Sequence, residues 1–193
     1  RGQFKAASER YRTIGGVSFD GAHSGATADH ADFAIGSKCT VFGWCNCATP
    51  GASGSIIGQF DTATSNRAWL VQVNTSGKMV VLTSADGSST AAQVKNYASS
   101  ITIGDSRFHS FAFTFDAGLL RLYVDGGEDG AVTKTGDGAS AITIFDSTAV
   151  VNIGCNRNGA DVNLYTGILD ECRFYKTVKT PVQIMAMHQL GRP

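Results

Sequence analysis

The sequence predicts an all-β protein, folded as a two-sheet antiparallel sandwich, from three features of its 193 residues. There are 23 glycines and only three prolines, a composition that suits many short strands joined by tight turns, because glycine adopts positive φ without strain. Apolar and polar residues alternate over short stretches, with turn residues about every ten positions. Helix signals occur in one short stretch near the C-terminus. Such strands need a second sheet to bury their apolar faces.

The clearest pattern lies in residues 107–127. Three phenylalanines alternate with Ala112 and Thr114 in residues 111–115, and three aliphatic residues alternate with Arg121 and Tyr123 in residues 120–124. The Asp-Ala-Gly stretch between them is a turn sequence. This pattern predicts a β-hairpin with one strongly apolar face, around which the rest of the chain must pack.

Similar patterns, with Gly-, Ser- and Asp-rich breaks, predict the elements before the hairpin. The predicted strands are residues 17–19, 39–47, 55–60, 68–73, 79–83 and 98–103. Residues 1–16 are polar, lack clear periodicity and end in two glycines. We therefore expect an N-terminal arm at residues 1–16 and one domain at residues 17–193.

After the hairpin, residues 128–140 and 155–163 are polar and are predicted to be loops. Short strands are predicted at residues 142–145 and 150–153, and a final long strand at 165–175. Thr180 followed by Pro181 is a helix-start signal, so one short helix is expected through Leu190. Ile184, Met187 and Leu190 would then face the body of the domain.

Charge and cysteine content exclude several classes of function. Sixteen basic and sixteen acidic residues cancel, so no bulk field attracts nucleic acid or an anionic membrane. No run of about 18 apolar residues is present, so we expect no membrane insertion. Five cysteines cannot all pair within one chain. Cys45 and Cys47 form a C-x-C motif without a second pair at zinc spacing, so most of the cysteines are expected to be small buried hydrophobes.

Together these segments resemble the laminin-G-like domain of the concanavalin A-like lectin and glucanase superfamily, which implies a jelly-roll sandwich. Phe108 stands where the family's hairpin usually has Trp, and Ser110 where it often has a second His. The stretches that carry the likeness are VSFDG (17–21), CTVFGWCNC (39–47), the hairpin (107–127) and the closing segment VNIGCNRNGADVNLYTGILDECRFYKTVKTPVQI (151–184).

Catalysis is considered because the superfamily contains glucanases, but no catalytic residue is predicted. Retaining hydrolysis needs two carboxylates about 5 Å apart, which that branch supplies as E-x-D-x-x-E. No such string occurs here, and Asp170 and Glu171 are expected to point to opposite faces of a strand. The stretch Gly104-Asp105-Ser106 is similar to an esterase nucleophile block without its downstream Asp-x-x-His. His109 is expected to be partly buried and bonded to backbone.

The resemblance also implies a structural calcium site. Relatives commonly hold one Ca²⁺ between loops through oxygen ligands. By motif position Asp170 resembles such a ligand, with Asp20 and Gly21 nearby in the opening turn. The alternative is that Asp170 is a hydrogen-bonded strand carboxylate. No cofactor is otherwise required.

Sugar binding needs an exposed aromatic ring that stacks on a pyranose, with amides and carboxylates for the hydroxyls. Each candidate has the alternative of being a packed or solvated residue. The available aromatic platforms are Trp44, Trp69, Tyr97 and Tyr165, and the polar loop residues are Asn66, Arg67, Asn156, Arg157, Asn158 and Asp161.

These observations predict a non-catalytic recognition or adhesion module for a glycan or a protein surface, located outside the cell. The alternative is a structural virion component of a phage fibre, tail or capsid decoration, in which residues 1–16 would mediate self-assembly. Unpaired cysteines suit particles assembled in a reducing cytoplasm. A glycoside hydrolase is the third class, and it rests on the superfamily alone.

Overall fold

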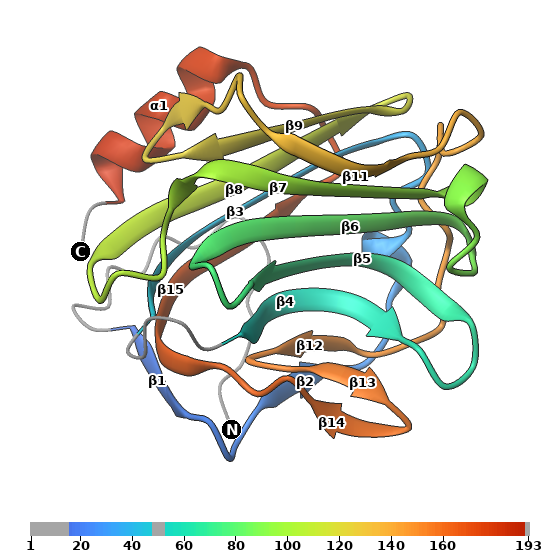
Figure 1. Ribbon diagram of the computed structural model, residues 1–193, viewed down its shortest axis with the longest axis horizontal. Coiled ribbons are helices and arrows are strands. Elements are labelled where there is room, and N and C mark those ends of the chain that lie inside the picture. Colours follow the sequence, from blue (N-terminus) through green and yellow to red (C-terminus); the bar gives the residue numbers. More distant parts are fainter. Residues whose placement is uncertain (1–15, 48–52, 192–193) are drawn as a thin grey trace.

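Two curved sheets stack face to face in the computed structural model, which describes residues 16–47 and 53–191 (Figure 1). The six-stranded sheet has the order β1 (Val17–Asp20), β15 (Thr166–Tyr175), β3 (Lys38–Cys47), β8 (Phe108–Asp116), β9 (Leu119–Val124) and β10 (Gly127–Glu128). The nine-stranded sheet has the order β11 (Thr133–Asp137), β7 (Val94–Thr102), β6 (Lys78–Gly87), β5 (Asn66–Val73), β4 (Gly54–Asp61), β12 (Val151–Ile153) and β2 (Gly25–Thr27). The predicted antiparallel sandwich, consistent with a jelly roll, is confirmed.

Two small strands and two short 3-10 helices lie outside this strand order. The hairpin of β13 (Asn156–Asn158) and β14 (Ala160–Val162) joins the nine-stranded sheet through one parallel pair, Arg157 with Asp61. The 3-10 helices are η1 (Ala31–Phe33) and η2 (Ala91–Gln93). Residues 1–15, most of the predicted arm, lie outside the described residues.

The core lies between the two sheets, and the predicted hairpin supplies one side of it. Phe111, Phe113 and Phe115 of β8 are at most 1% exposed and belong to one apolar cluster with Trp69 of β5. The Trp69 ring is tilted on Phe113, with centroids 6.2 Å apart. Period-two alternation thus places every second side chain of the hairpin strands β8 and β9 in the core.

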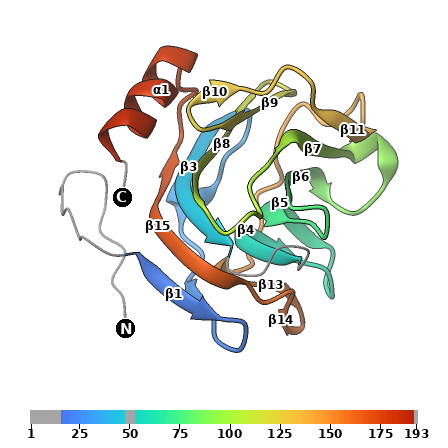
Figure 2. The ribbon, with the colours of Figure 1, turned by 60° about the vertical axis from the view of Figure 1, so that its left-hand side comes forward.

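The helix α1 (Pro181–Leu190) packs on the outer side of the six-stranded sheet (Figure 2). Thr180 and Gln183 form a capping box at its start, as the sequence signals predict. Its buried side rests on a second apolar cluster that contains Phe42, Trp44, Ala112, Tyr123, Ile184 and, at the margin, Met187. Leu190 is 73% exposed, so the prediction that it faces the body is wrong. No helix among the described residues is long and apolar enough to span a membrane.

The sequence misassigned three segments after the hairpin. The predicted loop 128–140 contains β11, and the predicted loop 155–163 contains the β13–β14 hairpin. These strands are short, polar and largely exposed at sheet margins, so no apolar alternation marks them. The predicted strand 142–145 forms only an isolated bridge between Ile144 and Gly36.

The β15 strand contains a bulge that the sequence did not predict. Its register with β3 shifts between Asp170 and Arg173, and Glu171 has φ 48°. The expectation that Asp170 and Glu171 point to opposite faces assumed a regular strand and does not hold here. The Glu171 carboxylate instead accepts a hydrogen bond from Arg173, at 2.6 Å.

Four of the five cysteines are buried, and Cys172 alone among them is more than marginally exposed. Burial raises the pKa of Cys39 and Cys45, and it raises the pKa of Cys172 to about 12. The prediction that most of them act as small buried hydrophobes is confirmed.

Candidate ligand-binding loop cluster

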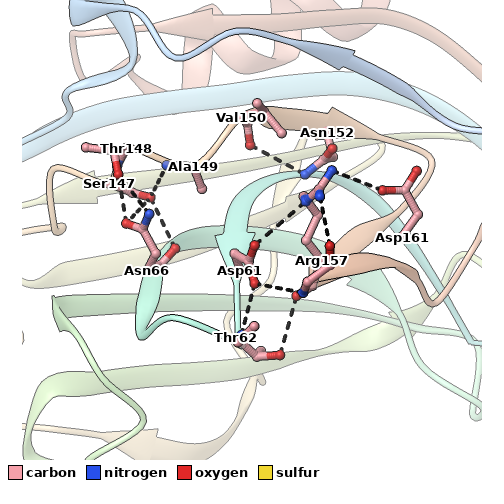
Figure 3. Close-up of polar contacts among 12 residues, drawn as sticks. Asp61, Thr62, Asn66, Ser147, Thr148, Ala149, Val150, Asn152, Arg157 and Asp161 are labelled. Carbon is pink, nitrogen blue, oxygen red and sulfur yellow. Dashed lines mark hydrogen bonds and ion pairs between the residues drawn. The ribbon is translucent and has the colours of Figure 1, made fainter.

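Three polar segments meet at one end of the nine-stranded sheet, and we call them the loop cluster: residues 61–67, 146–150 and 156–162 (Figure 3). Gln59 of β4 holds the middle segment in place, because its side-chain amide donates to the carbonyls of Ser147 and Ala149 at 2.9 and 3.0 Å. The parallel pair of Arg157 with Asp61 brings the third segment alongside β4. The sheet therefore positions all three segments.

Arg157 links two carboxylates within the loop cluster (Figure 3). Its Nη1 lies 3.4 Å from Asp161 Oδ1, and its Nε lies 3.7 Å from Asp61 Oδ2. Its Nη2 donates to the Gly159 carbonyl at 3.0 Å. The side chains of Arg157 and Asp161 are 33% and 39% exposed, so both reach solvent.

The hairpin turn is fixed by backbone contacts to the β4–β5 turn. Asp61 Oδ1 accepts hydrogen bonds from the backbone of Ala63 at 2.9 Å and Gly159 at 3.3 Å. Gly159 has φ +74°, a conformation that side-chain-bearing residues rarely adopt. The Thr62 amide donates to the Arg157 carbonyl at 3.0 Å. These contacts hold Asn158 at the exposed turn.

Asn66 and Arg67 belong to the loop cluster, but their polar groups are used in hydrogen bonds within the protein. Asn66 Oδ1 accepts from the Ser147 hydroxyl at 2.7 Å and the Thr148 amide at 3.2 Å. The Arg67 guanidinium donates to the carbonyls of Gly87 and Thr62, both at 3.2 Å. Both residues therefore stabilise the loops.

Asn156 lies below the surface of the loop cluster. It is 6% exposed, and its Oδ1 accepts from Ser55 Oγ at 3.2 Å and Asn163 Nδ2 at 3.0 Å. Of the six polar residues predicted from the sequence, Arg157, Asn158 and Asp161 are therefore the ones that the structure places together with side chains open to a ligand.

The aromatic residues predicted as sugar platforms are all buried, so that prediction is wrong. Trp69 is fully buried in the core between the sheets, and Tyr165 is 1% exposed. Trp44 is 1% exposed beneath α1, where it stacks on His188 with centroids 5.0 Å apart. Tyr97 is 3% exposed and donates to Asp137 at 2.5 Å. None of the four offers a ring face to solvent.

The predicted calcium ligands are not brought together. In the β1–β15 register Asp20 pairs with Thr166 and Val17 with Leu169, so Asp170 lies more than about 13 Å along the strand from the Asp20–Gly21 turn. Asp20 accepts hydrogen bonds from the backbone of Ala22 and from His23, which lowers its pKa to about 2. In the part of the chain that the structure describes, no group of three His, Cys, Asp or Glu side chains could hold a metal.

Sequence reasoning missed Asp61, Ser147 and Asn152. Val151 and Ile153 belong to the core between the sheets, so Asn152 between them points to the outer face. It is 1% exposed, and its Oδ1 accepts no hydrogen bond from any residue of 16–47 or 53–191. Asp61 follows a predicted strand in a polar stretch, and that position was the one signal available.

A second polar cluster surrounds His109, at the start of β8. Its ring nitrogens lie 2.9 Å from Asp125 Oδ2 and 2.9 Å from Asp105 Oδ1. The expectation that His109 bonds to backbone is therefore wrong. Burial alone would lower the pKa of His109. The hydrogen bonds and charges of the two carboxylates raise this pKa by more than burial lowers it, so the net shift is upward.

Known structures share the fold at low sequence identity. The CBM40 domain of the Ruminococcus gnavus IT-sialidase, bound to α2,6-sialyllactose, is 15% identical with a TM-score of 0.65, over 90% of this chain and 96% of that one. Domain 4 of an extracellular arabinanase from Geobacillus stearothermophilus, in complex with arabinotriose, is 17% identical with a TM-score of 0.63. The match covers 89% of this chain and 75% of that one. The LG1-3 region of the laminin α2 chain is 14% identical with a TM-score of 0.64. The match covers 90% of this chain and 33% of that one.

No curated protein sequence matches the chain. A family model does match it, over residues 20–185, and this span contains both sheets except for the first strand residues of β1. The chain belongs to the concanavalin A-like lectin/glucanases superfamily, in agreement with the laminin-G-like resemblance of its sequence.

Proposed function

We propose that this chain is a non-catalytic glycan-binding module that acts outside the cell, with the loop cluster as its binding site. The observation that carries the proposal is the constellation of Asp61, Arg157, Asn158 and Asp161 at one end of the sandwich. Carboxylates, amides and guanidinium groups on rigidly held loops are the polar groups that fix sugar hydroxyls. Two neighbours of the fold carry bound oligosaccharides, which supports this class of ligand.

The loop cluster gives no support to glycoside hydrolysis. The Arg157 guanidinium contacts both Asp61 and Asp161, so it occupies space that a scissile bond would need between two catalytic carboxylates. The virion role stays a prediction, since it depends on residues 1–16, which lie almost entirely outside the described residues.

The test is a glycan array probed with the purified chain and with an Asn158→Ala/Asp161→Ala variant. We expect the wild type to bind a defined set of glycans and the variant to lose at least about tenfold in affinity, because hydrogen bonds to charged groups contribute about 1.5–3 kcal/mol.

The matched control is Glu128→Gln. Glu128 is 40% exposed and pairs with Arg121 at 3.2 Å on the other sheet, much as Asp161 pairs with Arg157. The control should bind as the wild type does, and thermal melts should show that all proteins are folded. Binding that survives the double substitution would exclude the loop cluster as the site, and binding to no glycan would exclude the function.

A further inference from the structure

We propose that the loop cluster selects neutral, hydroxyl-donating sugars and discriminates against acidic ones such as sialosides. This inference rests on the proposed glycan-binding function, and it names the class of ligand. It follows from three properties of the loop cluster, namely which donors are in use, which acceptors are free, and the sign of the net charge.

The guanidinium groups of the loop cluster already face acceptors within the protein. Arg157 Nη2 donates to the Gly159 carbonyl at 3.0 Å and Nη1 lies 3.4 Å from Asp161 Oδ1, while Nε faces Asp61 Oδ2 at 3.7 Å, an ion-pair contact beyond hydrogen-bond distance. The Arg67 guanidinium donates through both Nη atoms to the backbone carbonyls of Gly87 and Thr62. A ligand carboxylate would have to displace a protein carboxylate from Arg157 to gain a bidentate contact.

Acceptor sites remain at the same place, although Asp61 Oδ1 accepts from two backbone amides and Asp161 Oδ2 accepts from the Ser24 hydroxyl. The contact from Asp61 Oδ2 to Arg157 Nε is 3.7 Å, longer than a hydrogen bond, and the contact from Asp161 Oδ1 to Arg157 is long at 3.4 Å. An ionised carboxylate accepts at about four lone-pair sites and donates none.

The net charge of the loop cluster is negative. Its segments contain three carboxylates, from Asp61, Asp146 and Asp161, and two guanidinium groups, from Arg67 and Arg157. Asp29 adds a fourth carboxylate at the margin, since its Oδ1 accepts from the Gln59 amide at 2.9 Å. The remaining acceptor sites and the negative charge favour a ligand that brings hydroxyl hydrogens, and they repel a ligand that brings another carboxylate.

The experiment compares matched pairs of neutral and sialylated glycans, such as lactose-terminated and sialyllactose-terminated probes, by array and then by titration calorimetry. We expect the sialylated member of each pair to bind at least about tenfold more weakly, because like charges at an interface are strongly unfavourable. Raising NaCl from about 0.05 M to about 0.5 M should reduce the discrimination, since salt screens exposed charges.

An Asp161→Asn variant separates charge from shape. It keeps the size of the side chain, removes one negative charge and frees one Arg157 donor, so the preference for the neutral member should fall several-fold. The Glu128→Gln control should keep the wild-type preference, and thermal melts should confirm that both variants are folded.

The outcomes distinguish failure of this selectivity from failure of the proposed glycan-binding function. Sialylated probes that bind as tightly as their neutral partners, or more tightly, would overturn the selectivity and leave the glycan-binding function standing. Failure to bind any glycan would overturn both. A preference for neutral sugars that Asp161→Asn leaves unchanged would overturn the electrostatic origin assigned here.

Discussion

His109 is held between two carboxylates, and we predict that this arrangement stabilises the fold more at mildly acidic pH than at alkaline pH. Carboxylates only accept hydrogen bonds, so the contacts of Asp105 and Asp125 with the two ring nitrogens both need an N–H. Only the protonated imidazole carries an N–H on both ring nitrogens. The pKa of His109 is raised above its usual value of 6.5, so the stabilisation is complete below about pH 6.5 and is lost as the pH rises through the folded-state pKa.

The perturbation is His109→Gln, which removes the charge and can donate to only one carboxylate at a time in this geometry. Two hydrogen bonds to charged groups would be worth about 1.5–3 kcal/mol each if buried. The His109 ring is 13% exposed, but Asp105 and Asp125 are 32% and 43% exposed, and solvent screening brings the expected loss to about 2 kcal/mol. For a domain of this size that is a fall in Tm of about 4–8 °C near pH 6.

The assay is calorimetric melting of wild type and variant between about pH 5.5 and 9, below and above the usual histidine pKa. The difference in Tm should narrow as the pH rises. The matched control is His30→Gln. The His30 side chain is 67% exposed and its Nδ1 lies 3.3 Å from Asp32 Oδ2, so this substitution is expected to lower the free energy of unfolding by less than about 0.5 kcal/mol. A difference between wild type and His109→Gln that stays constant across the pH range would refute the reasoning and reduce His109 to a packing residue.

Three further predictions concern packing, capping and thiol reactivity. A Gly43→Ala substitution should destabilise by about 1–3 kcal/mol in urea unfolding, because the new Cβ would lie 2.7 Å from the buried Phe111 ring; no loss would contradict this packing. Thr180→Ala should cost about 1 kcal/mol by the same measurement, because it removes the capping box of α1, and an unchanged midpoint would argue against the cap. A thiol reagent at about pH 8 should label all five cysteines in denaturant but react far more slowly with native protein; fast native labelling would contradict their burial.

Local pattern was enough to predict most of the fold. The alternation in residues 111–115 and 120–124 predicts β8 and β9, and Thr180-Pro181 predicts the start of α1. Both signals arise from neighbours in sequence, which is why they can be read without the structure. The strand β11 pairs with β7, and the β13–β14 hairpin joins the sheet through β13 and β4, so both depend on strands far away in sequence. None of the three has apolar alternation of its own, so sequence alone did not reveal them.

The candidate site was predictable only in part, because burial depends on which element covers which face. Residues 39–47 were correctly predicted as a central strand, yet Trp44 is buried because α1 lies over its outer face. Arg157 and Asp161 were chosen from the sequence as polar loop residues. Their partner Asp61 could not be, because it meets them only through the pairing of β13 with β4. Contacts between segments so far apart in sequence leave no local signature.

Chemical-shift mapping by NMR, with a neutral oligosaccharide from the array titrated into the labelled chain, tests the central claim most directly. The loop cluster as the binding site predicts that the perturbed amides fall in residues 61–67, 146–150 and 156–162, with Asn158 and Asp161 among the largest shifts. Perturbations confined to the six-stranded sheet, for example around the exposed Phe108, would contradict the account and move the site to the opposite face of the sandwich.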